Sequence, residues 1–527
     1  MYMNFLKSSW PFILLAVLSF TIHFAFLSYP SQVVFDEVHF GKFVAAYSTG
    51  QYYFDIHPPL GKLMIAGFTK LAGVNPVFDF AQIGENLPAA TLFALRFLPA
   101  FFGALFVLAF SWLAWLIGHS KQTALIAGFL ILLDNGILVQ SKFILVDIFM
   151  LCFEVLTLCF FFLWQRQKSF SAKWFSYLAL TGVFAGLTVS VKWTGVAVIG
   201  IIGVILLVKI FSEKLALYLS LPAHSHSERS EESPADAGRH KVGDPSAYGL
   251  GMTKLGLFKE GLVGSIFLLI LAFLVYLPPF YLHFQLLPNS GVGDAFMSQA
   301  FQQELKYGRD NIYQPLTFWQ KFVELNKTMY TASAGLTAEH PFGSRWYNWP
   351  LNSKSVYYWN QETISGLPDW KAKIYFFGNP MLWPLAAFGV LFTLLAALIP
   401  KSRRWLFSVF YNWQRGRSKN LFSLRPSEPI SNDVIVYILL LGYFINLLPF
   451  IFIKRVAFLY HYLPSLIYAV LILSLWLDKF WPKEKAIFSI VMGLIVLGFF
   501  LLAPLSYGWP LPQSLDQIEI NFIGLFH

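Results

Sequence analysis

The sequence predicts an all-α polytopic membrane protein. Of its 527 residues, 57% are hydrophobic, 18% are aromatic and only 13% are charged, whereas soluble proteins carry about 25% charged residues. The mean hydropathy is +0.58. Apolar segments long enough to cross a bilayer as helices recur along the whole chain. Together these observations exclude a water-soluble enzyme.

Eleven apolar segments of about 17 to 25 residues meet the length requirement for a membrane-spanning helix. They are residues 11–28, 97–117, 122–139, 143–164, 174–191, 194–211, 262–282, 381–400, 434–453, 456–477 and 487–506. The first follows Lys7 and resembles a signal peptide, but it has no small-residue cleavage site. We therefore count it as the first span.

The composition also excludes other classes of protein. The 56 Phe and 17 Trp are incompatible with a disordered chain, and two Cys cannot staple a chain of this length. Cys152 and Cys159 lie in an apolar run and are predicted to be buried. The formal net charge is +10, but the basic residues form no stripe interleaved with aromatic residues, so we expect no nucleic-acid partner.

The distribution of Lys and Arg predicts the orientation. With a cytoplasmic N-terminus, the inner segments hold 22 Lys and Arg and the outer segments hold 15. The bias is strongest between residues 401 and 425, and loops of this length follow the positive-inside rule most reliably. We therefore predict a multi-pass membrane protein with its N-terminus on the cytoplasmic side and its C-terminus outside.

This orientation divides the chain into three parts. Residues 1–283 form an N-terminal transmembrane catalytic module with a first outer loop at 29–90 and an inner loop at 212–260. Residues 284–380 form a second outer loop, and residues 381–527 a C-terminal transmembrane module. The inner loop is poor in apolar residues and is predicted to be disordered. The outer loops are rich in aromatic and acidic residues, so we expect the function on the outer face.

Asp36 and Glu37 are adjacent carboxylates directly after the first span. Neighbouring side chains on a helix point about 100° apart, so the two cannot both face one substrate atom. A glycosidase with two flanking carboxylates is therefore poorly served by this pair. One carboxylate could act as a general base while the other orients it. The alternative is that Asp36 only caps a short helix that begins near Glu37.

Residues 57–62 read His-Pro-Pro-Leu-Gly-Lys. The prolines predict an extended turn, and Gly61 permits a close approach of another segment. Lys62 would then stand at the outer membrane boundary, where it could meet a lipid phosphate. The alternative is a lysine that extends towards the interface from an interfacial helix.

Ionisable residues inside or at the ends of spans are costly and are therefore functional candidates. They are Arg96, Asp134, Lys142, Asp147, Glu154, Lys192, Lys454, Arg455 and His461. Their cations fall at one depth, which predicts a positively charged cavity for an anionic lipid-linked ligand. The alternative is that internal ion pairs hold the bundle together, and Asp147 with Lys142 or Lys192 is the pair we expect.

The second outer loop contains an aromatic segment, residues 339–351, that includes His340 and Trp346. Aromatic faces beside hydrogen-bond donors suit sugars and extended peptides. An interfacial loop that rests on lipid has the same composition, so this segment alone does not separate the two roles.

Several of these stretches together resemble the protein O-mannosyltransferase family. They follow the family order over residues 30–465. They are residues 35–42 (Phe-Asp-Glu-Val-His-Phe-Gly-Lys), 57–62, 95–100 (Leu-Arg-Phe-Leu-Pro-Ala), 133–135, 140–147, 190–195, 340–347 and 458–464 (Phe-Leu-Tyr-His-Tyr-Leu-Pro).

The resemblance implies a GT-C type glycosyltransferase architecture of eleven helices with two large extracytoplasmic loops. It implies transfer of mannose from a polyprenyl-phosphate mannose donor to Ser or Thr hydroxyls of secreted proteins. Eukaryotic members carry a β-trefoil domain in the second outer loop. Residues 284–380 leave no room for that domain, so the chain resembles a bacterial-type member.

The resemblance also implies roles for individual residues in a single inverting displacement. Asp36, or else Glu37, is the expected base. The expected ligands of the donor phosphate are Arg96, Lys62, Arg455 and His461. The expected substrate and sugar contacts are His57, His340, Trp346 and Tyr460. We expect no metal, although a divalent cation bound by Asp36, His39, Asp55 and His57 is an alternative.

Two rival functions remain open at this stage. A lipid-directed sugar transferase, such as an aminoarabinose transferase, would share the architecture but use a lipid acceptor. A transporter would place its polar residues at mid-membrane rather than at the outer boundary. The expected partners are the lipid-linked donor, the acceptor polypeptide and membrane lipid, with a dimer as a further possibility.

Overall fold

A computed structural model describes residues 2–211, 254–337, 339–364, 366–399 and 432–524. The inner loop predicted to be disordered lies mostly outside these ranges. Its last seven residues, 254–260, are helical because helix α11 already begins at Lys254. The basic segment at 401–425 also lies outside the described residues.

Helices account for most of the described chain, which confirms the predicted fold class. The longer helices are α1 (Tyr2–Phe24), α4 (Ala89–Gly118), α5 (Lys121–Leu132), α6 (Asn135–Lys142), α7 (Asp147–Gln165), α8 (Ala172–Val191), α9 (Val196–Phe211), α11 (Lys254–Leu286), α14 (Leu382–Leu398), α16 (Asn432–Leu447), α17 (Leu463–Phe480) and α18 (Lys485–Tyr507). Shorter helices are α2 (Glu37–Thr49), α3 (Leu60–Leu71), α12 (Gln299–Tyr307), α13 (Phe318–Gly335) and α19 (Gln513–Gly524).

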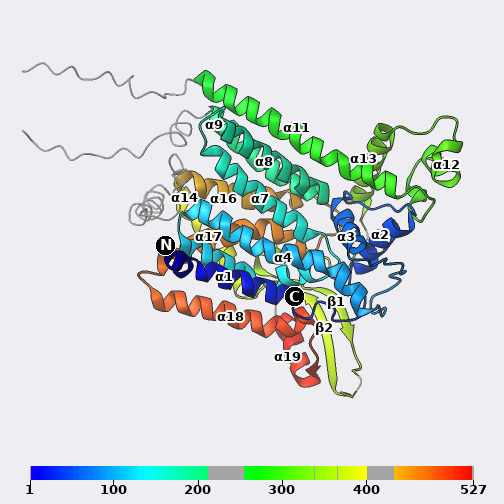
Figure 1. Cartoon of the computed structure of the whole chain (residues 1–527). Helices are drawn as coiled ribbons and strands as arrows, with labels where there is room; N and C mark the ends of the chain where they lie inside the picture. Colours follow the sequence, from blue (N-terminus) through cyan, green and yellow to red (C-terminus); the bar gives the residue numbers. More distant parts are fainter. Residues whose placement is uncertain (1, 212–253, 338, 365, 400–431, 525–527) are drawn as a thin grey trace, which may run out of the picture.

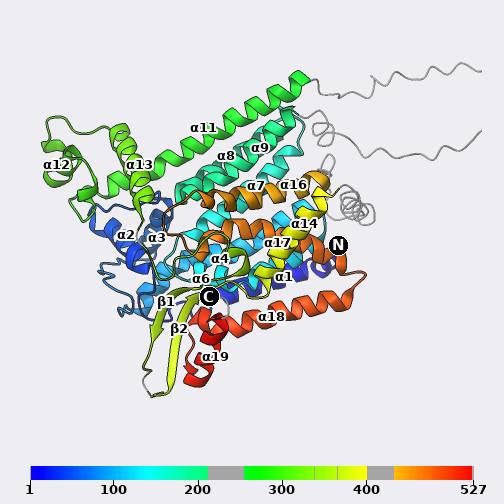
Figure 2. The same cartoon turned by 180° about the vertical axis from the view of Figure 1, so that it is seen from behind.

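The long helices form a bundle with a buried centre (Figures 1 and 2). Helices α7 and α17 are buried over most of their length, whereas α11 and α18 are largely exposed. Helix α7 packs against α4 and α8, and α8 packs against α11. The exposed apolar faces of α11 and α18 suit contact with lipid, because lipid tails solvate apolar side chains as well as the protein core does.

The count of eleven spans is not confirmed. Within the described residues, six helices are long and apolar enough to cross a membrane, and the bent pair α5 and α6 makes a seventh. Shorter apolar helices of 10–17 residues occupy the other four predicted segments. The protein is nevertheless a multi-pass membrane protein.

The predicted span at 122–139 is broken. Helices α5 and α6 meet at an angle of 63°. At the break, Asp134 Oδ1 accepts the backbone N–H of Ile137 at 2.8 Å, and its Oδ2 accepts the indole N–H of Trp383 at 2.6 Å. Asp134 therefore has a structural role as a helix cap.

A small sheet, which the sequence analysis did not expect, lies at one end of the bundle. Strand β1 (Val356–Gln361) pairs antiparallel with β2 (Trp370–Phe376), and β2 pairs with the short β3 (Leu511–Pro512). Helices α2, α3, α12, α13 and α19 gather at this same end, and α1 begins at the opposite end (Figures 1 and 2). We call this end of the bundle, with α2, α3, α12, α13 and the sheet, the sheet end.

Candidate active site

Asp36 lies directly before helix α2 at the sheet end. Its side chain is half-buried and caps no backbone N–H of α2. The helix-cap interpretation of Asp36 is therefore wrong. Burial raises the pKa of Asp36 to about 7; Asp147 and Asp55 add to this rise and Lys192 opposes it. A carboxylate with a pKa near the working pH suits a general base.

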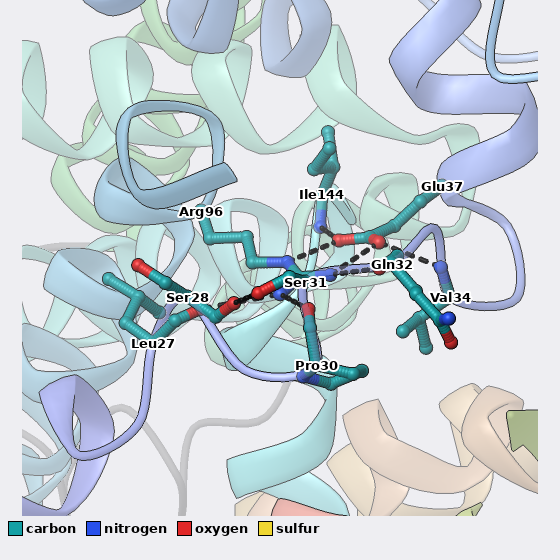
Figure 3. A network of polar contacts seen from close by, with 9 residues as sticks. All are labelled: Leu27, Ser28, Pro30, Ser31, Gln32, Val34, Glu37, Arg96 and Ile144. Carbon is teal, nitrogen blue, oxygen red and sulfur yellow. Dashed lines mark hydrogen bonds and ion pairs between the residues drawn. The ribbon is translucent and has the colours of Figure 1, made fainter. Parts of the chain in front are cut away.

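The carboxylate of Glu37 is bound on both oxygens. Its Oε1 accepts from Arg96 Nε and its Oε2 from Arg96 Nη2, both at 2.8 Å (Figure 3). Oε2 also accepts the backbone N–H of Val34 at 2.8 Å, and Oε1 that of Ile144 at 3.0 Å. Both side chains of the ion pair are fully buried. Glu37 therefore ties the chain around Asp36 to Arg96 of helix α4.

Arg96 does not face a donor phosphate, contrary to the prediction. Besides Glu37, its guanidinium donates to the carbonyl oxygens of Leu27, Pro30 and Gln32 at 3.3, 2.9 and 2.8 Å. These bonds and the two to Glu37 account for the five N–H donors of an arginine. A fully buried guanidinium without a free donor cannot bind an entering ligand (Figure 3).

Lys62 is also largely engaged. Its ammonium bonds to Asp55 and donates to the carbonyl oxygen of His57 at 2.8 Å. It lies 5.7 Å from the ring centre of Phe43, and the residue is 1% exposed. Burial lowers the pKa of Lys62, and Asp55 opposes this effect. The structure thus makes Lys62 a partner of Asp55 rather than an open phosphate ligand.

The expected ion pair between Asp147 and Lys192 is confirmed. Lys192 Nζ lies 2.7 Å from Asp147 Oδ1 and 5.7 Å from the ring centre of Tyr460. Lys142, the other predicted partner of Asp147, instead donates to the carbonyl oxygen of Ala25. The pair lies close enough to Asp36 for both members to influence its ionisation.

His57 marks an electropositive region beside this pair. Burial together with the charges of Lys192, Lys62 and Arg455 lowers the pKa of His57 well below its usual value, so this imidazole is neutral at physiological pH. Arg455 donates through Nη1 to Ser333 Oγ at 2.5 Å, and its remaining N–H groups make no hydrogen bond to the described residues. Arg455 is therefore the predicted phosphate ligand that the structure leaves available.

The aromatic candidates are partly brought together. Tyr460 stacks on Phe458 and His461 at ring-centre distances of 5.4 and 4.8 Å. His340 is exposed and lies edge-on to Phe458 at 5.0 Å. Trp346 is half-buried, and its ring lies 5.8 Å from that of the neighbouring Tyr347. In the described ranges its ring pairs with no aromatic ring of another predicted site residue.

The described part of the chain contains no cluster of side chains that could bind a metal ion. No set of three or more His, Cys, Asp and Glu residues lies close enough there to hold a metal ion. Asp36, His39, Asp55 and His57, the residues of the divalent-cation alternative, do not form such a group.

Gln140 and Tyr358 are buried polar residues beside the site that the sequence analysis did not single out for a role. Gln140 Nε2 donates a hydrogen bond to Asp147 Oδ2 at 3.1 Å, and Gln140 Oε1 accepts one from the hydroxyl of Tyr358 at 2.7 Å. Gln140 lies within a stretch that resembles the family. Tyr358 lies in an aromatic run, Tyr-Tyr-Trp, that could be read as strand or interface, so no sequence signal identifies this contact.

Residues 13–288 match the model of the dolichyl-phosphate-mannose-protein mannosyltransferase family, and residues 318–520 match the C-terminal four-helix transmembrane region of protein O-mannosyltransferases. Protein O-mannosyltransferase 1 of Drosophila melanogaster is 32% identical over 311 residues, which cover 58% of this chain and 31% of that protein. Dolichyl-phosphate-mannose–protein mannosyltransferase 6 of Saccharomyces cerevisiae is 31% identical over 297 residues. These cover 56% of this chain and 35% of that protein. The chain spans about a third of the length of these relatives.

Two solved structures share the fold. The S. cerevisiae protein O-mannosyltransferase Pmt1-Pmt2 complex bound to the sugar donor aligns with a TM-score of 0.77 and 19% identity, over 97% of this chain and 92% of that chain. The oligosaccharyltransferase AglB of Archaeoglobus fulgidus aligns with a TM-score of 0.50 and 15% identity, over 96% and 56%. The family match over more than half of the sequence decides the assignment. This chain belongs to the protein O-mannosyltransferase family.

Proposed function

We propose that this protein transfers mannose from a polyprenyl- or dolichyl-phosphate mannose donor to Ser or Thr hydroxyls of polypeptides. Family membership and the names of the relatives support the donor and the acceptor class. The reaction takes place at the sheet end, on the outer face of the cell membrane, with the N-terminus of the chain inside.

The contrast between the two adjacent carboxylates carries the proposal. Within the described residues, Glu37 is bound on both oxygens, whereas the side chain of Asp36 makes no hydrogen bond. Asp36 is also half-buried beside the Lys192–Asp147 pair. A carboxylate that is held in place by its neighbours but has a free oxygen can accept a proton from a substrate hydroxyl.

The proposed reaction is a single in-line displacement. The acceptor oxygen forms a bond to the anomeric carbon of mannose as the bond from that carbon to the phosphate oxygen breaks. Asp36 takes the proton of the acceptor hydroxyl, and a positioned base contributes roughly 10²–10⁴-fold to such a rate. The lipid phosphate leaves as a stable anion, so no general acid is required. The displacement inverts the anomeric centre.

Arg455 is the proposed phosphate ligand, and Lys192 adds positive charge nearby. Arg455 has N–H groups that bond to no described residue, and both cations act electrostatically on His57. Fixed cations at the leaving group stabilise the charge that develops in the transition state. The neutral imidazole of His57 and the ring of Tyr460 lie in the same region and are proposed to contact the sugar, together with His340 and Trp346. His461, which stacks on Tyr460, is proposed as a further ligand of the donor phosphate.

Membranes that hold the wild type, Asp36→Asn or Asp79→Asn provide the test. They are incubated with radiolabelled polyprenyl-phosphate mannose and a Ser/Thr-rich peptide, and label on the peptide is measured. Asp79 is an exposed carboxylate of the same outer segment, so Asp79→Asn is the matched control. We expect transfer by the wild type and the control, and a loss of roughly 10²-fold or more in Asp36→Asn. Transfer of label to a lipid other than the donor, with none on the peptide, would instead identify a lipid-directed transferase.

A further inference from the structure

Strand β1 of the second outer loop contacts the chain immediately before Asp36. The backbone N–H of Phe35 donates to the carbonyl oxygen of Tyr358 at 3.0 Å, and the two rings stack at 4.1 Å with an interplanar angle of 14°. Residues 35 and 358 are far apart in sequence, so this contact joins the two outer loops at the site.

The backbone at Phe35 needs such support. Its φ is +44°, in the left-handed region that side-chain-bearing residues rarely adopt. The register of β1 against β2 shifts between Tyr357 and Trp359, which leaves Tyr358 outside the ladder. A bulge of this kind re-aims a side chain. Here it leaves the carbonyl of Tyr358 available for Phe35.

The side chain of Tyr358 continues in the direction of the Lys192–Asp147 pair. Its hydroxyl donates to Gln140 Oε1 at 2.7 Å, and Gln140 Nε2 donates to Asp147 Oδ2 at 3.1 Å. Asp147 Oδ1 in turn accepts from Lys192 Nζ at 2.7 Å. All four side chains are buried. The direction of each bond is defined, because the phenol uses its one proton on the amide oxygen and so turns the amide N–H towards the carboxylate.

We propose that Tyr358, acting through Gln140, is a positioning residue for Asp36. Strand β1 then supports the backbone at Phe35, which leads into Asp36, and through Gln140 it also supports the Lys192–Asp147 pair. This inference rests on the proposed function, since it assigns Tyr358 a role in the same reaction. Tyr358 itself touches no reacting atom in this proposal.

Several charged or titratable groups interact electrostatically with Asp36. They are Lys192, Asp147, Asp55, Tyr358 and Tyr460. Of these, Lys192 and Asp147 are tied to Tyr358 by hydrogen bonds. Loss of the Tyr358 hydroxyl is therefore expected to loosen the groups that set both the position and the ionisation of the base.

Tyr358→Phe tests the proposal, because it removes the hydroxyl but keeps the ring stack and the backbone bond to Phe35. Tyr357→Phe is the matched control. It makes the same change on the same strand, and its hydroxyl bonds instead to Asn360 Oδ1 at 2.5 Å. We expect kcat of Tyr358→Phe to fall about tenfold, the effect of one lost hydrogen bond, with an unchanged KM for the donor. The melting temperature should fall as well, because the buried amide oxygen of Gln140 loses its donor. Tyr357→Phe should retain wild-type kcat.

Double variants separate positioning from general support of the fold. If Tyr358 acts through Gln140, Tyr358→Phe with Gln140→Leu should be no slower than Gln140→Leu alone. If it acts on Asp36, Tyr358→Phe should not lower the residual rate of Asp36→Asn any further.

Full activity in Tyr358→Phe, or additive losses in both double variants, would overturn this inference and leave the proposed function intact. Absence of peptide labelling by the wild type would overturn the proposed function and the inference with it.

Discussion

Glu37 and Arg96 form a two-pronged ion pair in which each carboxylate oxygen lies 2.8 Å from a guanidinium nitrogen. The pair is fully buried, and Arg96 also holds three carbonyl oxygens of the segment between α1 and α2. The residue next to the proposed base is therefore an anchor. This relationship explains how two adjacent carboxylates have different surroundings, one fully paired and one without a hydrogen bond in the described residues.

Removal of one partner of this pair should destabilise the protein strongly. Arg96→Leu leaves Glu37 as an uncompensated buried charge, which costs about 3–5 kcal/mol. Glu37→Gln keeps the shape and leaves the charge of Arg96 unpaired. Thermal unfolding in detergent should show lower melting temperatures for both single variants. The double variant Glu37→Gln/Arg96→Leu should lose less stability than the two single variants lose together. Simple additivity would contradict a direct pair.

The pH dependence of transfer should report Asp36. Because the pKa of Asp36 is about 7 and the ionised form is the base, the rate should fall as pH drops below about 7, by about tenfold per unit. Lys192 lowers this pKa and Asp147 raises it. In pH profiles of kcat/KM, Lys192→Met should therefore move the acidic limb to higher pH, and Asp147→Asn to lower pH. Shifts in the same direction would contradict this electrostatic picture.

Asp36→Asn should stabilise the fold at alkaline pH. The pKa of Asp36 is raised above its ordinary value of 3.8 in the folded protein, so ionisation of Asp36 destabilises the fold increasingly as pH rises from about 4 to about 7. The melting temperature of the variant should exceed that of the wild type at pH 8, and the two should converge near pH 4. A lower melting temperature of the variant at pH 8 would contradict the burial of this charge.

Arg455→Gln should weaken binding of the donor. A lost hydrogen bond to a charged group costs about 1.5–3 kcal/mol, so the KM for polyprenyl-phosphate mannose should rise about 10- to 100-fold. The neighbouring Lys454 is exposed and makes no hydrogen bond to the described residues, so Lys454→Gln is the control. Equal effects of the two variants in donor titrations would show a general surface-charge effect and not a phosphate ligand.

Two glycines of helix α3 should respond in opposite ways to alanine. A Cβ at Gly61 would lie 2.8 Å from Val146 Cγ1, so Gly61→Ala should lower the free energy of unfolding by about 1–3 kcal/mol through overpacking. A Cβ at Gly67 meets nothing within 4 Å, so Gly67→Ala should stabilise the helix by up to about 1 kcal/mol. Thermal unfolding of both variants checks this difference. A destabilised Gly67→Ala would indicate a neighbour outside the described residues.

Much of the architecture could be predicted because its cause is local. A run of about 20 apolar residues favours a membrane helix whatever else the chain contains. The close approach at Gly61 was also predictable, since only glycine leaves room for it. The break at Asp134 was not predicted, because apolar residues continue on both sides of it and the carboxylate is satisfied by Trp383, which lies 249 positions away.

The candidate site shows the same division. From the sequence alone, the adjacency of Asp36 and Glu37 established that the two carboxylates diverge, because neighbouring side chains on a helix do so. Which of them remains free was decided by Arg96, 59 positions away from Glu37 in the sequence. Local patterns determine which groups are present and which segments are apolar enough to form membrane helices. Only tertiary packing decides which buried charges pair, because a buried charge must find its partner wherever the fold brings one.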